Sequence, residues 1–194
     1  MKKLGIISLV LLAALGITGV AYGAWTDTLN INSTAQTGYL DVRFGQAVSN
    51  DAASVDPTGP GAWTFSGGDL SWTGPVAATN EASTSVTSLS NLTLHFNVNG
   101  AYPGYNSSVG CTIENLGTVP VKIESIVPVI TPPSGGSASD VSVSFSGALS
   151  TGAMIGVGGS EAGAVYINWN SVPAQSATYL LTVYVTVSQW NAVT

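Results

Sequence analysis

Hydrophobic and polar residues alternate with a period of two through most of the chain. The clearest alternation lies in residues 40–44, 92–98, 109–113, 119–123, 141–145, 165–169 and 179–187. Each segment predicts a β-strand with one buried face, because successive side chains of a strand point to opposite sides of its sheet. Two shorter segments, 62–65 and 70–73, are further strand candidates.

Turn-forming residues separate these segments, for example at 56–61, 99–100 and 132–136. Gly, Pro, Asn and Asp supply the backbone conformations that tight turns need. No segment after residue 23 shows helical periodicity. We therefore predict an all-β fold, a single jelly-roll-type β-sandwich of about eight to ten strands over residues 35–194. Residues 47–91 are the least regular part, and we expect them to form an insertion between two core strands.

The first 23 residues have a different pattern, a continuous apolar run. Lys2 and Lys3 precede the run from Leu4 to Val20, and small residues follow in Ala21-Tyr22-Gly23. This is the layout of a secretory signal peptide, so we predict a helix that signal peptidase removes between Gly23 and Ala24. No second long apolar run follows, so stable membrane insertion is not expected after cleavage.

The strand pattern begins immediately after the predicted cleavage site. The segment concerned is Ala24-Trp25-Thr26-Asp27-Thr28-Leu29-Asn30-Ile31-Asn32-Ser33. Its Trp, Leu and Ile side chains fall on one face together with Asp27, and burying each of the three apolar side chains would contribute roughly 1.5–3 kcal/mol. We therefore expect residues 24–34 to pair as a strand, either with the sheet of their own domain or with another molecule.

Charged residues are scarce and mostly acidic. After cleavage only Arg43 and Lys122 are basic, against ten acidic residues, which gives a net charge of −8 (2 minus 10). Nucleic acids are excluded as partners because binding them requires Lys and Arg to displace counterions. A neutral surface of hydroxyls and amides instead suits a protein that packs against identical copies of itself.

Side chains for catalysis are also scarce. His95 is the only histidine and Cys111 the only cysteine, so the chain cannot assemble a zinc site from nitrogen and sulfur ligands. We expect His95 to face solvent and Cys111 to lie in the core. No nucleophile elbow, phosphate-binding loop or metalloprotease motif is present in the sequence. The sequence therefore predicts a protein that is not an enzyme and that holds no cofactor.

The sequence also indicates two kinds of modification or ligand site. Asn32, Asn91 and Asn106 each begin an Asn-x-Ser/Thr sequon, which carries glycan in some exported proteins. Loop carboxylates could bind calcium, although none has the spacing of a calcium-binding loop; they are Asp51, Asp56, Asp69 and Asp140.

Two groups of motifs resemble a known family. Trp25-Thr26-Asp27-Thr28 directly after the signal, followed by Gly38-Tyr39-Leu40-Asp41-Val42, is similar to the SipW-dependent exported proteins of the TasA/camelysin group. Pro103-Gly104, a strand, and then Asn115-Leu116-Gly117-Thr118 resemble the middle of the same proteins. The similarity extends over roughly residues 1–46 and 92–130.

The resemblance implies a jelly-roll subunit of extracellular biofilm fibres or of the related archaeal bundling pili. It implies that Ala24–Ser33 form a donor strand that fills a groove in the next identical subunit. The metalloprotease activity ascribed to some camelysin-type members is not carried over, because the chain lacks the histidines for it. One alternative is a monomeric or surface-attached β-sandwich that binds carbohydrate or coats the cell. The other is a secreted hydrolase, for which no catalytic residues stand out.

Overall fold

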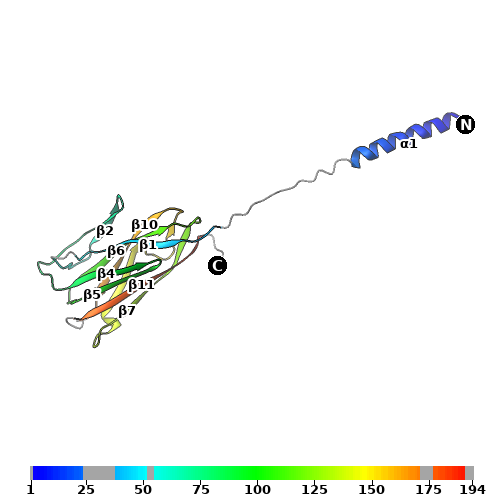
Figure 1. The fold of residues 1–194 in the computed structure, drawn as a ribbon. Coiled ribbons are helices and arrows are strands. Elements are labelled where there is room, and N and C mark those ends of the chain that lie inside the picture. Colours follow the sequence, from blue (N-terminus) through cyan, green and yellow to red (C-terminus); the bar gives the residue numbers. More distant parts are fainter. Residues whose placement is uncertain (1, 24–37, 52–54, 171–176, 191–194) are drawn as a thin grey trace. The chain divides into compact units, whose positions relative to one another are not determined.

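The structure is a computed structural model that describes residues 2–23, 38–51, 55–170 and 177–190 (Figure 1). The chain divides into two compact units, residues 1–37 and 38–194, and we describe each by itself. In the first unit, α1 (Lys2–Gly23) coincides with the predicted export segment. Among the described residues, no helix is both long enough and apolar enough to span a membrane.

The second unit is built from β-strands and one short 3-10 helix. The strands are β1 (Val42–Ser49), β2 (Ala62–Ser66), β3 (Asp69–Thr73), β4 (Ser83–Ser90), β5 (Thr93–Asn99), β6 (Asn106–Asn115), β7 (Val121–Thr131), β8 (Val141–Gly147), β9 (Met154–Ile155), β10 (Ser160–Trp169) and β11 (Thr178–Gln189). The helix, η1 (Ala138–Asp140), lies between β7 and β8. The all-β prediction is confirmed.

The strands form two main antiparallel sheets that pack face to face as a β-sandwich (Figure 1). One sheet has the order β1-β6-β10-β8 and the other the order β4-β5-β11-β7-β9, while β2 and β3 form a separate hairpin. Most of the core between the sheets comes from the faces that the alternation predicted, although Leu40, which alternates with Val42 and Phe44, is 48% exposed. The fully buried members of the core include Leu94, Phe96, Val98, Val109, Cys111, Ile113, Ile123, Val165, Ile167, Tyr179 and Val183.

The predicted insertion is shorter than expected. Residues 83–90 form β4, which pairs with β5 in the five-stranded sheet, so the insertion between core strands ends before Ser83. Only Val86 and Leu89 are large apolar residues in β4, and a register shift separates Val86 from Ser88. The strand therefore lacks the alternation that identified its neighbours. The remaining insertion carries the β2–β3 hairpin.

Candidate functional site

One side of the sandwich has unpaired strand edges. β8 pairs with β10 on one side only, and β7 pairs with β11 along its length. On its other side β7 meets β9 at Val121 and Lys122, and Ile123 bonds with Gly152 and Ala153. Among the described residues, nothing bonds to the remaining outer edge of β7, from residue 125 to residue 131. Free N–H and C=O groups of this kind can accept an additional strand.

The core is only partly covered by described residues along these edges. The inward-facing residues Ile126 and Ile130 of β7 and Val143 and Phe145 of β8 pack against the core but are only partly buried. Their cross-strand neighbours in the sheet interior are nearly inaccessible: Val185, Leu181, Ile167 and Val165 are at most 5% exposed. We call Ile126, Ile130, Val143 and Phe145, together with the two free edges, the open seam.

The open seam is closed at its two ends by connecting segments. The β7–β8 connection holds η1, where Asp140 accepts a hydrogen bond from the Tyr179 hydroxyl (2.9 Å). The segment after β8 places Leu149 and Ile155 in the core. Because β8 is seven residues long, the seam between these ends has room for a strand of about seven residues, roughly 23 Å.

The opposite side of the sandwich, between β1 and β4, is closed by the chain itself. The Phe44 N–H donates to the Asn91 carbonyl (2.6 Å), and the Thr84 N–H donates to the Asp51 carboxylate (2.7 Å). The Tyr105 hydroxyl donates to the same carboxylate (2.8 Å). These bonds join the two edge strands near both ends, so no strand is needed there.

A buried carboxylate supports the closed side. Asp56 is fully buried, and its side chain accepts hydrogen bonds from the N–H groups of Glu81 (2.8 Å) and Ala82 (3.2 Å). These two residues directly precede β4. Asp56 therefore fixes the point where the insertion returns to the sheet.

The predicted self-assembly residues lie outside the described part of the chain. This concerns all of Ala24–Ser33, including the sequon at Asn32, while Gly23 is the last residue of α1. The donor-strand assignment and the cleavage site therefore stay predictions.

The other two sequons lie in different environments. Asn91 is exposed in the turn between β4 and β5, where its φ of 35° lies in the left-handed region. Asn106 begins β6, and its side-chain amide donates to the Gly104 carbonyl (2.9 Å). Asn91 is thus the more accessible of the two to a modifying enzyme.

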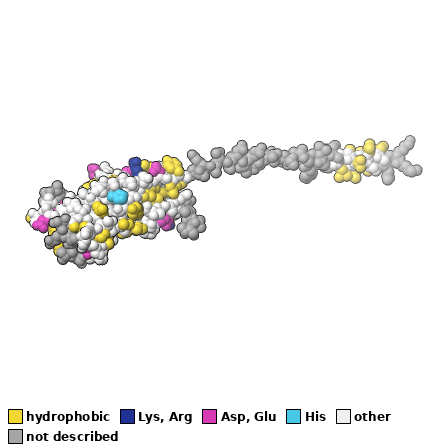
Figure 2. Space-filling model, turned by 60° about the horizontal axis from the view of Figure 1, so that its bottom comes forward, with side chains coloured by type: hydrophobic (Ala, Val, Ile, Leu, Met, Phe, Trp, Pro, Cys, Tyr) yellow, Lys and Arg dark blue, Asp and Glu magenta, His cyan; other side chains and the backbone are white. Residues whose placement is uncertain are grey.

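His95 and Cys111 lie where the alternation predicted. His95 is partly exposed on the outer face of β5, 3.0 Å from the Thr182 hydroxyl, and it is the cyan residue in Figure 2. Charged side chains are few on the face shown there. Cys111 is fully buried, and burial raises the pKa of its thiol to about 12, which makes it unreactive at neutral pH.

The four candidate calcium-binding carboxylates are dispersed. Asp51 and Asp56 bond to backbone N–H groups, Asp140 is part of the capping box of η1, and Asp69 is exposed in the hairpin. Within the described residues, no group of three or more His, Cys, Asp or Glu side chains could hold a metal ion.

Sequence reasoning missed the open seam, although one signal pointed to it. Residues 126–130 read Ile-Val-Pro-Val-Ile, which is apolar on both faces of the strand. Pro128 lies in the middle of β7, and proline within a sheet is largely confined to edge strands because it cannot donate a hydrogen bond. A proline in an unbroken apolar run therefore indicates an edge strand that contacts something on each face.

No protein-family model, no curated protein and no solved structure matches the chain.

Proposed function

We propose that the protein is a secreted structural subunit that polymerises head to tail into extracellular filaments or pili. About seven residues within Ala24–Ser33 of one subunit would occupy the open seam of the next, completing a jelly-roll-type sandwich by donor-strand complementation. The observation that carries this proposal is the pair of unpaired edges of β7 and β8, beside core residues that are only partly buried. The product would serve in a biofilm matrix or in cell–cell adhesion.

The chemistry of the donor segment fits the chemistry of the seam. Trp25, Asp27, Leu29 and Ile31 fall on one face of the segment, which therefore carries three large apolar side chains and one carboxylate. The four seam side chains are uncharged and apolar, and covering them would contribute roughly 25 cal/mol per Å² of buried apolar surface. Backbone hydrogen bonds to the two free edges would add about 0.5–1.5 kcal/mol each.

The connectivity explains why the product would be a filament. A segment donated from one subunit into a different site on the next makes a heterologous contact, which continues indefinitely unless the rotation closes a ring. The donor segment follows α1 directly. Signal peptidase would free it, so an uncleaved variant is expected to stay unpolymerised.

The decisive experiment removes the donor segment and then returns it as a peptide. We expect the cleaved protein lacking residues 24–33 to form no fibres in negative-stain electron microscopy. A synthetic peptide of residues 24–33 should bind this truncated subunit and raise its melting temperature. The matched control is the same peptide with Leu29→Asp and Ile31→Asp, which should not bind.

Two results would contradict the proposal. One is normal fibres from the truncated protein. The other is a cleaved full-length protein that remains monomeric by light scattering at high concentration, which is the behaviour of a monomeric surface module.

A further inference from the structure

The outer face of the four-stranded sheet carries a groove that the filament proposal does not use. The β2–β3 hairpin lies over this face, and its Trp63 ring rests on Gly110 of β6, where any side chain would collide with the indole. The Trp63 indole N–H donates to the Ser108 hydroxyl (3.0 Å). The hairpin is thereby fixed to the sheet, and the groove beside it is already formed.

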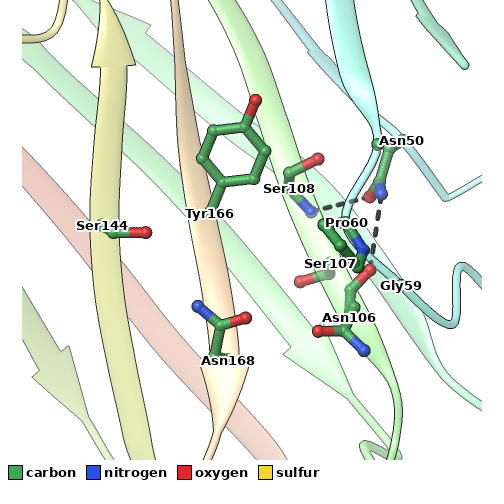
Figure 3. Close-up of a pocket in the computed structure, with 10 residues that line it drawn as sticks. Asn50, Gly59, Pro60, Asn106, Ser107, Ser108, Ser144, Tyr166 and Asn168 are labelled. Atoms are coloured by element: carbon green, nitrogen blue, oxygen red, sulfur yellow. Dashed lines mark hydrogen bonds between the residues drawn. The ribbon is translucent and has the colours of Figure 1, made fainter. Parts of the chain in front are cut away.

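The groove consists of two adjacent hollows that share Tyr166 of β10. The larger, of about 180 Å³, lies between the segment before β2 and the strands β6, β10 and β8 (Figure 3). The smaller, of about 100 Å³, lies between the hairpin and the far part of β8 and β10, with Phe65 on its wall. Pockets for drug-sized ligands measure roughly 300–1,000 Å³, so each hollow has room for only one small part of a larger ligand.

The lining of both hollows is neutral. Among the described residues that line it there is no Lys, Arg, His, Asp or Glu, so a phosphate, carboxylate or cation would find no opposite charge in them. The side-chain oxygen of Asn50 already accepts a hydrogen bond from the Ser108 N–H (2.7 Å) and so is not available to a ligand. Ligands that depend on ionic contacts are therefore disfavoured.

Three hydrogen-bonding side chains in the larger hollow remain available. Ser144 of β8 lies directly across from Tyr166 of β10, and Asn168 follows on the same face of β10 (Figure 3). The side chains of all three make no hydrogen bond to any described residue. Together they offer two hydroxyls and one amide around an aromatic ring.

We propose that this groove binds a neutral saccharide. Sugar rings present hydroxyl groups at their edges and C–H groups on their faces, and the groove offers hydroxyl and amide partners for the first and the Tyr166 ring for the second. The two hollows on either side of Tyr166 fit consecutive sugar units of an oligosaccharide. A peptide that pairs as a strand would instead need a free strand edge; β10 is paired on both sides, and the free edge of β8 belongs to the open seam.

The proposed saccharide groove and the open seam are independent features. Ser144 faces the groove, while Val143 and Phe145 of the same strand face the seam. Saccharide binding should therefore persist in the truncated protein lacking residues 24–33. If the full chain binds no saccharide, the filament proposal is unaffected.

The test screens the full chain against a panel of neutral oligosaccharides, with sulfated and uronic acid oligosaccharides as controls. The protein is made in a host that adds no N-glycan, because Asn106 lines the larger hollow. We expect at least one neutral member to bind, to change tryptophan fluorescence, and to bind more tightly than its charged counterparts. The absence of any neutral binder, or equal binding of charged ones, would overturn the proposal.

Two variants locate the binding. Ser144→Tyr fills the larger hollow from an exposed position and should abolish binding. Tyr166→Phe keeps the ring but removes the hydroxyl, and it should weaken binding by roughly two- to tenfold, the contribution of one neutral hydrogen bond. The matched controls are Ser85→Tyr and Tyr184→Phe, at exposed positions of the other sheet, which should leave binding unchanged. Binding that both groove variants leave intact would contradict the assignment.

Discussion

The two sides of this sandwich are built differently. Between β1 and β4, two hydrogen bonds join the two edges: the Phe44 N–H donates to the Asn91 carbonyl, and the Thr84 N–H donates to the Asp51 carboxylate. Between β7 and β8, the described residues make no such connection. Partly buried apolar side chains occur on both sides, at Ala47, Val86 and Leu89 as well as in the open seam, so the unpaired edges are what distinguish the second side. The chain therefore closes one pair of sheet edges with its own hydrogen bonds, and the open seam is a specific property of β7 and β8.

The difference arises from which residues lie at each side. The closed side has polar side chains that reach across, with Asp51 accepting bonds from both Thr84 and Tyr105. The open seam presents only aliphatic and aromatic side chains, which cannot bridge two backbones but can be covered by a further strand. One side is thus complete within the subunit, and the other has the chemistry of an interface.

The largest expected effect is on assembly, from a charge placed in the open seam. Ile126→Asp should abolish fibre formation, because a donated strand would have to bury an unpaired carboxylate. Val127→Asp is the matched control: Val127 is the next residue of β7, points outward, and is 49% exposed. Fibres are counted by electron microscopy, with melting temperatures recorded to show that both variants fold.

Two outcomes would break the contrast between the two sides. If Ile126→Asp still forms fibres, the seam is not an acceptor site. If Val127→Asp abolishes fibres equally, assembly uses the outer face of the five-stranded sheet instead.

The next largest effect is on the stability of the closed side. Asp56→Ala should lower the free energy of unfolding by about 3 kcal/mol, because it leaves the buried N–H groups of Glu81 and Ala82 without an acceptor. Asp69→Ala, at an exposed position of the hairpin, should change it by less than about 0.5 kcal/mol. Urea unfolding followed by tryptophan fluorescence measures both; equal effects would mean that Asp56 does not anchor the insertion.

A smaller effect is expected in the pH dependence of stability. Burial raises the pKa of Asp51 above its ordinary value of 3.8, although the hydrogen bonds from Tyr105 and Thr84 act in the opposite direction. The folded protein therefore binds this proton more readily than the unfolded chain does. As pH rises through the interval just above 3.8, the Asp51 contribution makes the free energy of unfolding fall.

Asp51→Asn should remove that contribution while keeping an oxygen acceptor for Thr84 and Tyr105. We expect the difference in unfolding free energy between the variant and the unmodified protein to shift in favour of the variant as pH rises from about 4 to 6. Asp69→Asn is the matched control. A difference that is constant with pH, or that shifts the other way, would show that Asp51 does not take up its proton preferentially in the folded state.

The sequence predicted the two faces of most strands because burial enforces alternation locally. It did not predict β4, which pairs with the neighbouring β5 but is held against the other sheet by distant residues: the Thr84 N–H donates to Asp51, and the Asn91 carbonyl accepts from Phe44. Such contacts cannot be read from the period of a polar segment. The same limit applies to the open seam, because which inward residues stay uncovered depends on strand order.

The candidate site shows this division clearly. The donor segment was predicted from its own alternation and remains a prediction, while its proposed acceptor required the tertiary structure. Val143 and Phe145 looked like ordinary core residues in the sequence, just as Val165 and Ile167 did. Only the strand order shows that β8 lies at an edge and β10 does not.

The smallest expected effect concerns the ion pair between β1 and β6, next to the closed side. Arg43 bonds to Glu114 across the strands (3.0 Å), with side chains 52% and 29% exposed. Exposed pairs of this kind contribute little, so Arg43→Ala should lower the unfolding free energy by at most about 1 kcal/mol. The effect should shrink in high salt, and a double-mutant cycle with Glu114→Ala isolates the pair. We attribute the closure of this side to the hydrogen bonds of Phe44 and Asp51. A larger, salt-insensitive effect would mean that Arg43 also contributes to that closure.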